Sequence, residues 1–218
     1  MALEGVLFDM DGVLADSEEF IAAAAKAMFA ETYGVTVALE DFLPFVGAGE
    51  DRYLGGVAAQ YGVTPDLPRD KARTYEIYGA LIQGRLQPLP GAIAFVKAAR
   101  ARGLRTALAT SADKPKMTST LGAIGLSPED FDATINGLDV VRKKPFPDIF
   151  LEAARRVGLE PGSCLVVEDA VNGVKSALAA GCRCLALSTT FSEAELRAAG
   201  ATQIVPNLAH ADLDQFLA

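Results

Sequence analysis

The stretch Val6-Leu7-Phe8-Asp9-Met10-Asp11-Gly12 joins a short apolar run directly to an acidic loop. An apolar run of this kind is typical of a strand that is buried on both faces, as in a parallel sheet. Its abrupt end places two carboxylates where the chain would leave the sheet. We therefore predict a buried first strand at 6–8 and expect the chemistry of the protein to begin at residue 9.

Beyond Pro88-Leu89-Pro90-Gly91 the sequence alternates between helical and strand patterns. This alternation is typical of parallel strands that are covered by helices on both faces. We therefore predict an α/β fold with a Rossmann-like, doubly wound parallel sheet. The predicted strands are 105–109, 133–135, 165–167, 184–187 and 203–205, and the predicted helices are 92–102, 115–121, 147–157, 173–180 and 193–199.

The segment between the first strand and this alternating region shows helical patterns and no strong strand. We expect Asp16 to cap a first helix, with Glu19 at the capping-box position, and Gly34 to end it. Two further helices are predicted at 50–60 and 68–82. The sequence therefore predicts two parts: an α/β core formed by 1–14 and 88–218, and an inserted, all-helical cap at 15–87.

The composition excludes several functional classes. Half of the 218 residues are hydrophobic, enough for a substantial core, and 20 basic against 28 acidic residues give a net charge of −8. Because a duplex-binding protein needs a basic face, we expect neither nucleic acid nor a membrane as a partner. The chain shows no signal-peptide or membrane-span pattern, and we expect a cytoplasmic protein.

The scarce residues narrow the chemistry further. One histidine, His210, cannot supply a three-histidine zinc site, and we expect it at the surface. The three cysteines, Cys164, Cys182 and Cys184, match neither zinc-site spacing nor a secreted disulfide framework. We therefore expect them to pack in the core.

Polar residues follow several of the predicted strands. In doubly wound sheets, ligands bind beyond the carboxyl ends of the strands, so these residues are candidates for a site. Each of them could instead cap a neighbouring helix, but their joint occurrence at one edge favours a site. The candidates are Asp9 and Asp11 after the first strand, Thr110 and Ser111 after 105–109, Lys144 before 147–157, and Glu168 and Asp169 after 165–167.

Clustered carboxylates without histidine or thiolate suit a hard cation such as Mg²⁺. A lysine and hydroxyl groups nearby are then candidate phosphate ligands. The sequence has no GxxxxGK[ST] loop, and Gly47-Ala48-Gly49 lacks the third glycine of a dinucleotide-binding loop. We therefore predict that separate residues hold a phosphate group.

The motif Phe8-Asp9-Met10-Asp11-Gly12-Val13-Leu14 with Asp16-Ser17 resembles the first motif of the haloacid-dehalogenase (HAD) superfamily of phosphatases. Thr110, Lys144 and the pair Glu168-Asp169 match the second, third and fourth motifs in order. The resemblance covers essentially the whole chain and is closest to the branch of β-phosphoglucomutase and phosphoglycolate phosphatase, which carries a helical cap. The segments 44–57 and 189–200 also resemble the HAD domain of plant suppressor-of-quenching proteins.

This resemblance implies a Mg²⁺-dependent phosphatase that hydrolyses a small phosphorylated metabolite, a sugar phosphate or a phosphoglycolate-like compound, through an aspartyl phosphate. It implies that Asp9 is the nucleophile and Asp11 the general acid and base. It also implies that the metal is held by the side chains of Asp9 and Asp169 and the backbone carbonyl of Asp11, with Glu168 binding directly or through a water. Thr110 and Lys144 would bind the phosphate, and Ser111 is a further candidate beside them.

We expect the cap to determine the substrate, because the core contacts atoms that all phosphate esters share. Gly47 and Arg52 are the candidate substrate-binding residues of a loop at 47–52, although the glycines of this loop could simply end one helix and begin another. We expect a monomer or a weak homodimer.

Two alternatives stay open. A phosphosugar mutase resembling β-phosphoglucomutase would need a cap histidine and a cap arginine where this chain has Ile21 and Glu50. A non-catalytic, phosphate-responsive binding module would also cluster acids, a hydroxyl and a lysine at strand ends. The two-residue spacing of Asp9 and Asp11 and the long insertion argue against that module.

Overall fold

A six-stranded parallel sheet forms the centre of the computed structural model, which describes residues 2–46 and 49–217. The strand order is β3-β2-β1-β4-β5-β6, so β1 lies between β2 and β4 and the order of connection reverses there. This is the order of a Rossmann-like fold, and the predicted fold class is confirmed. The strands are β1 (Gly5–Phe8), β2 (Arg105–Ala109), β3 (Ala133–Ile135), β4 (Cys164–Glu168), β5 (Arg183–Leu187) and β6 (Gln203–Val205).

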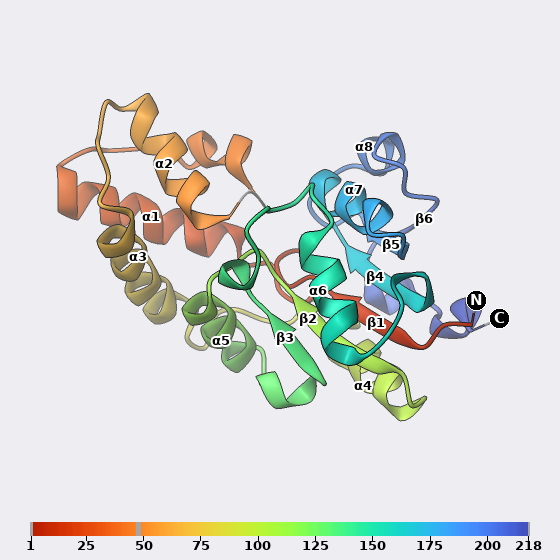
Figure 1. The fold of residues 1–218 in the computed structure, drawn as a ribbon. Coiled ribbons are helices and arrows are strands. Elements are labelled where there is room, and N and C mark those ends of the chain that lie inside the picture. The colour runs from red at the N-terminus through yellow and green to blue at the C-terminus, as the bar shows by residue number, and fades with distance from the viewer. Residues whose placement is uncertain (1, 47–48, 218) are drawn as a thin grey trace.

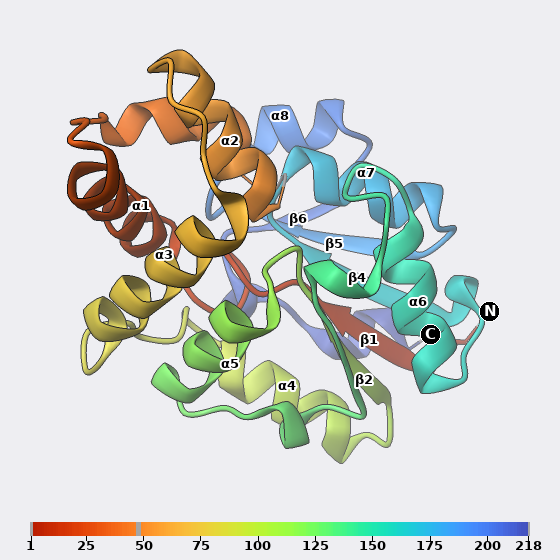
Figure 2. The ribbon, with the colours of Figure 1, turned by 60° about the vertical axis from the view of Figure 1, so that its left-hand side comes forward.

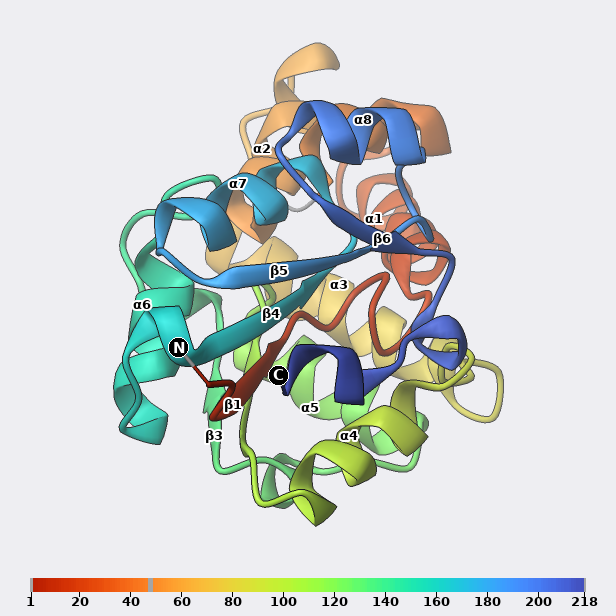
Figure 3. The same cartoon turned by 90° about the vertical axis from the view of Figure 1, so that its right-hand side faces the viewer.

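Helices cover both faces of the sheet, as Figure 3 shows. Successive strand residues point to opposite faces, so Phe8 joins one hydrophobic cluster and Leu7 the other. The cluster around Phe8 includes residues of α4 (Ala92–Ala101) and α5 (Lys114–Ala123). The cluster around Leu7 includes residues of α6 (Asp148–Val157), α7 (Val171–Ala179) and α8 (Glu193–Ala198).

Helical structure fills the segment between β1 and α4. It consists of α1 (Glu18–Tyr33), the 3₁₀ helix η1 (Leu39–Phe45), α2 (Glu50–Gln60) and α3 (Leu67–Ile82). These elements lie together on the side of the molecule away from both termini (Figure 1). The helix α3 packs against α5 of the core, where the hydroxyls of Tyr78 and Thr120 are 2.7 Å apart (Figure 2).

The chain leaves and re-enters the core at neighbouring points. Ala15 forms an antiparallel bridge with Pro88, and the backbone N–H of Leu89 donates to the carbonyl of Leu14 at 2.9 Å. We propose on these contacts that 1–14 with 88–218 forms the core domain and that 15–87 forms the cap. Their two connections then lie side by side, close to the end of β1.

The start of the first helix differs from the sequence prediction. Ser17, not Asp16, is the N-cap residue of α1, and no side-chain capping bond forms there. The Ser17 hydroxyl instead donates to the carboxylate of Asp11, a charged acceptor that makes a stronger hydrogen bond than a neutral group. At the other end, Gly34 ends the helix in the left-handed conformation, with φ 67°, as predicted.

The scarce residues lie where the sequence predicts. His210 is exposed, and the three cysteines, Cys164, Cys182 and Cys184, are buried and free. Among the described residues, no helix combines the length and the apolar character needed to cross a bilayer.

Candidate active site

Three carboxylates meet at the carboxyl edge of β1 and β4. These strands are paired in register, with Phe8 opposite Val167, so the residues that follow them are neighbours. The backbone N–H of Asp9 continues the ladder by donating to the carbonyl of Val167 at 3.0 Å. Oxygens of Asp9, Glu168 and Asp169 lie within 4.8 Å of one another, and all three residues are buried. The predicted convergence of these acids is therefore present.

Lys144 is inserted among these acids from the loop before α6. Its Nζ donates to Asp9 Oδ1 and to Glu168 Oε1, both at 2.6 Å. The second oxygen of Glu168 accepts from the backbone N–H groups of Asp169 and Ala170, both at 2.8 Å. Both oxygens of Glu168 are thus engaged, which fixes the carboxylate and, through it, the lysine.

Burial shifts the ionisation of this cluster. It raises the pKa of Asp9 to about 7; the nearby Lys144 opposes the shift, and the charges of Glu168 and Asp11 add to it. Burial, together with Glu168 and Asp9, also raises the pKa of Asp169. Burial alone would lower the pKa of Lys144, but its two carboxylate partners raise it overall. The lysine is therefore charged. The raised pKa values of Asp9 and Asp169 reflect the cost of holding several buried carboxylates close together, and a bound cation would offset that cost.

Two glycines give the carboxylates their space. Gly12 has φ +73°, and a Cβ there would lie 1.9 Å from Oδ2 of Asp169. A Cβ on Gly173 would lie 1.8 Å from the carboxyl carbon of Glu168. Neither distance is sterically possible, so both positions require glycine while the acids keep their places.

Asp11 lies on the cap side of the cluster. Its carboxylate accepts the Ser17 hydroxyl and, at 2.8 Å, Nζ of Lys116. Lys116 comes from α5, is buried, and also lies 3.9 Å from Glu50 Oε1 of the cap. Burial alone would lower the pKa of Lys116, but Asp11 and Glu50 raise it overall. One ammonium therefore links the core to α2.

The other predicted phosphate ligands end β2. The hydroxyl of Thr110 accepts the backbone N–H of Ala112 at 3.1 Å, which orients it at the strand end. The hydroxyl oxygen of Ser111 is buried and has no hydrogen-bond partner. Both residues line the same cleft as Asp9 and Lys144, so the structure brings together all the predicted residues of the core.

The cleft, which has a volume of about 70 Å³, lies between the carboxyl edge of the sheet and the helices α1 and α2. Its cap wall contains two half-buried acidic residues. Glu18 accepts the hydroxyl of Tyr53 at 2.8 Å, and burial raises its pKa. Glu50 lies opposite Lys116, and burial raises its pKa to about 7. The other cap residues that line the cleft are Asp16, Ile21, Phe45, Val46 and Gly49.

The predicted cap residues lie elsewhere or outside the described residues. Arg52 is exposed and lines a neighbouring pocket with Lys143 and Phe146, not the cleft itself. Gly47 lies outside the described residues, so its role stays a prediction.

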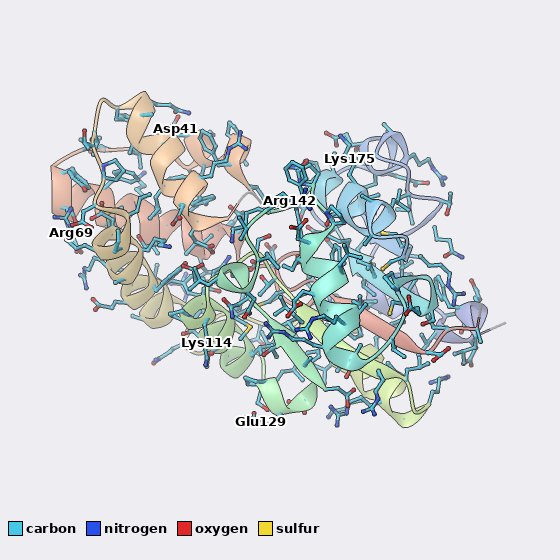
Figure 4. The ribbon with its side chains drawn as sticks, viewed as in Figure 1. Asp41, Arg69, Lys114, Glu129, Arg142 and Lys175 are labelled. Carbon is cyan, nitrogen blue, oxygen red and sulfur yellow. The ribbon has the colours of Figure 1, made fainter. Side chains whose placement is uncertain are left out.

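Two basic residues of the core do not line the cleft. Lys114 and Arg142 are exposed; Figure 4 labels Lys114 at the edge of the molecule and Arg142 in the loop before α6.

Sequence reasoning missed several residues of the cleft. Tyr53, Asn172 and Thr190 all line it, and no motif marked them. Glu18 directly follows the Asp16-Ser17 signature, so its position next to the first motif was an available signal. Thr190 lies close to Gly12, where a Cβ would meet its hydroxyl at 2.8 Å.

A doubly wound sheet that presents a carboxylate cluster and a buried lysine to a capped cleft defines an α/β enzyme equipped for phosphate chemistry. Residues 3–181 match the family model described as haloacid dehalogenase-like hydrolase. The chain therefore belongs to the haloacid dehalogenase-like hydrolase family, and the resemblance seen in the sequence is confirmed. It is an enzyme of the phosphatase type within that family.

Individual relatives agree with this assignment. The chain is 41% identical to the chloroplast protein suppressor of quenching 1 of Arabidopsis thaliana over 99% of its own length, and it spans 21% of that protein. It is 33% identical to hexitol phosphatase A of Escherichia coli, covering 86% of this chain and 84% of that protein.

A solved structure shares the whole fold. This is a variant of CbbY from Rhodobacter sphaeroides in complex with xylulose (1,5)bisphosphate. It superposes with a TM-score of 0.88 over 98% of this chain and 99% of that chain, at 26% identity.

Proposed function

We propose that this protein is a Mg²⁺-dependent phosphatase that hydrolyses a small phosphorylated metabolite of the sugar-phosphate type through an aspartyl phosphate. The observation that carries the proposal is the buried cluster of Asp9, Glu168 and Asp169 around Lys144, with Asp11 two residues beyond Asp9. The names of hexitol phosphatase A and of the CbbY complex with a sugar bisphosphate support a phosphorylated sugar or polyol as the substrate.

The donor set fits Mg²⁺. It consists only of oxygens and is buried, and a divalent cation would offset the repulsion that contributes to the raised pKa values of Asp9 and Asp169. We assign Asp9, Asp169 and the backbone carbonyl of Asp11 to the metal. Both oxygens of Glu168 already have partners, and we assign it to positioning Lys144. When bound, the metal would neutralise charge on the phosphate and on the nucleophile.

The residues of the chain can carry out both halves of the hydrolysis. A carboxylate oxygen of Asp9 attacks phosphorus, the bond from phosphorus to the ester oxygen breaks, and protonated Asp11 gives its proton to the leaving oxygen. Water then attacks the aspartyl phosphate while Asp11 takes a proton from it, which regenerates Asp9 and releases inorganic phosphate. Lys144, Thr110 and Ser111 would hold the remaining phosphate oxygens.

A panel of phosphorylated metabolites tests this function directly. We expect phosphate release to require Mg²⁺, to stop in EDTA and to return when excess Mg²⁺ is added, because the proposed ligands are all oxygens. Mg²⁺ should also raise the midpoint of thermal unfolding without any substrate, since an ion that binds only the folded chain stabilises it. Full activity in EDTA would disprove the metal assignment, and no release from any ester would disprove the function.

The variant Asp11→Asn tests the proton-transfer role. We expect kcat to fall by roughly 10²–10⁴-fold, because an amide cannot give and take the proton of the leaving group and of water. The measurement is phosphate release as a function of pH, compared with wild type. A rate and a pH profile equal to those of wild type would assign acid–base chemistry to another residue.

The cap favours hydrolysis over the mutase alternative. Ile21 and Glu50 line the cleft where the mutase pattern requires a histidine and an arginine. Ile21 cannot act as a base for a second substrate hydroxyl, and Glu50 supplies no cation for a second phosphate. Asp9 pairs with Lys144 of the loop before α6, and Asp11 pairs with Lys116 of α5. These two separate ion pairs also support catalysis rather than a non-catalytic phosphate-binding module.

The remaining expectations concern partners and location. We propose a small phosphorylated metabolite as the partner, with no nucleic acid and no membrane, and a monomer or weak homodimer. A cytoplasmic location stays a prediction, and one relative is a chloroplast protein.

A further inference from the structure

Glu50 has a largely buried carboxyl group that the proposed reaction does not use. It is the first residue of α2, and its side chain is 9% exposed. One of its oxygens, Oε1, lies 3.9 Å from Nζ of Lys116, beyond hydrogen-bond distance. The other oxygen, Oε2, is buried without a hydrogen-bond partner. Because Glu50 lines the same cleft as Asp9, it is available to a molecule bound there.

The positive charges of the cleft are already matched. Among the described residues that line it, the cations are Lys116 and Lys144. Lys144 lies between Asp9 and Glu168, and Lys116 lies between Asp11 and Glu50. A phosphate at Asp9 would engage Lys144. A second anion near the cap would find Lys116 already facing two carboxylates.

The unpaired oxygen of Glu50 therefore selects for donors. A buried polar oxygen without a partner is unfavourable, and a hydroxyl group from a ligand would satisfy it. Above pH 7, where Glu50 is mainly ionised, a phosphate or carboxylate at the same place would instead meet a like charge in a poorly solvated cleft. The second acid of the cap wall, Glu18, adds to this preference, although its oxygen Oε1 already accepts from Tyr53.

We propose that Glu50 determines specificity: its free Oε2 accepts a hydrogen bond from a hydroxyl of an uncharged leaving group. The enzyme then takes monophosphates of sugars or polyols and rejects esters that carry a second phosphate or a carboxylate. This inference rests on the proposed function and narrows its substrate class. Glu50 becomes a substrate-contacting residue contributed by the cap, whereas Asp9, Asp11 and Lys144 act on the phosphate.

Two matched pairs of competitors test the proposal. Fructose 1-phosphate is compared with fructose 1,6-bisphosphate, and glycerol 3-phosphate with 3-phosphoglycerate, as inhibitors of p-nitrophenyl phosphate hydrolysis in Mg²⁺. In each pair, the member with an uncharged leaving group is fructose 1-phosphate or glycerol 3-phosphate. For wild type we expect this member to bind at least about tenfold more tightly than the other member of its pair. In Glu50→Gln this preference should fall by about tenfold, because Lys116 loses one carboxylate neighbour and can meet an anion.

A control variant separates this effect from a general change of charge. Glu40→Gln removes the same charge from an exposed position of the cap and should leave both the activity and the preference unchanged. Circular dichroism and thermal unfolding establish that each variant is folded. Three results would overturn the proposal. The first is an equal preference in wild type and Glu50→Gln, and the second is tighter binding of fructose 1,6-bisphosphate or 3-phosphoglycerate by wild type. The third is no competition by either pair.

The same assay keeps the two proposals apart. If wild type releases no p-nitrophenol in Mg²⁺, the proposed phosphatase function fails. If wild type is active but its preference does not depend on Glu50, only the specificity inference fails.

Discussion

Replacing Asp9 by asparagine is expected to lower kcat by roughly 10⁴-fold or more while the fold stays intact. The amide oxygen is a poor nucleophile for phosphorus, so no aspartyl phosphate forms. The substituted side chain has the same shape and can still accept from Nζ of Lys144, the contact that Asp9 makes at 2.6 Å. Phosphate release measures the loss of activity, and thermal unfolding measures the fold.

A matched control for this variant lies in the same loop. Asp16 also lines the cleft but is exposed and lies outside the buried carboxylate cluster. We expect Asp16→Asn to keep a rate close to that of wild type. If Asp9→Asn retained the same rate as Asp16→Asn, the nucleophile would have to be another residue.

The core of this site could be predicted because a parallel sheet leaves little freedom. All strands present their carboxyl ends at one edge, so residues that follow separate strands converge whatever lies between them in the sequence. Asp9 and Asp169 are 160 positions apart in the numbering, yet both follow paired strands. The predicted strands, with the polar residues that follow them, were sufficient to expect both acids at one edge, and the structure adds that β1 and β4 are direct neighbours.

The cap wall of the cleft could not be predicted in the same way. The pattern of α2 and α5 predicts helices, but the angle at which two helices meet depends on the packing of all their side chains. The approach of Glu50 on α2 to Lys116 on α5 depends on how α3 packs against both of these helices. The 3₁₀ helix η1, which contains Pro44, was also missed, because a short 3₁₀ helix lacks the 3.6-residue period.

The error at the start of α1 has a similar origin. A capping residue is predicted from local sequence, and Asp16 is a good local candidate. The decisive partner, Asp11, lies in the loop that precedes the helix, and the Ser17 hydroxyl bonds to it instead of to the helix backbone. Competition between a catalytic carboxylate and a helix end is visible only in three dimensions.

Replacing Lys144 by methionine is expected to abolish activity and to lower the free energy of unfolding by about 3–5 kcal/mol. The ammonium is buried and lies 2.6 Å from both Asp9 and Glu168, so its loss leaves the carboxylates of the cluster without a positive partner. Removing one member of a buried ion pair is costly because the other charge cannot return to water. Urea unfolding in EDTA measures this cost without any contribution from a bound metal.

The neighbouring lysine provides the control. Lys143 donates to the backbone carbonyls of Gly137 and Val140 and has no carboxylate partner in the cluster. For Lys143→Met we expect a loss of about 1 kcal/mol, the usual contribution of such hydrogen bonds. Equal losses for the two lysines would show that Lys144 does not act through the charge of the cluster.

A double variant identifies the cause of the instability. In Lys144→Met with Glu168→Gln, the new amide can keep its oxygen on the backbone N–H groups of Asp169 and Ala170, which Glu168 Oε2 accepts at 2.8 Å. Its NH₂ group then faces Asp9 where Lys144 stood, and one buried negative charge is gone. We therefore expect the double variant to be more stable than Lys144→Met alone, although still inactive. If the second substitution instead added its own loss to the first, the instability would come from lost packing around Phe150, which lies 5.1 Å from Nζ of Lys144, and not from uncompensated charge.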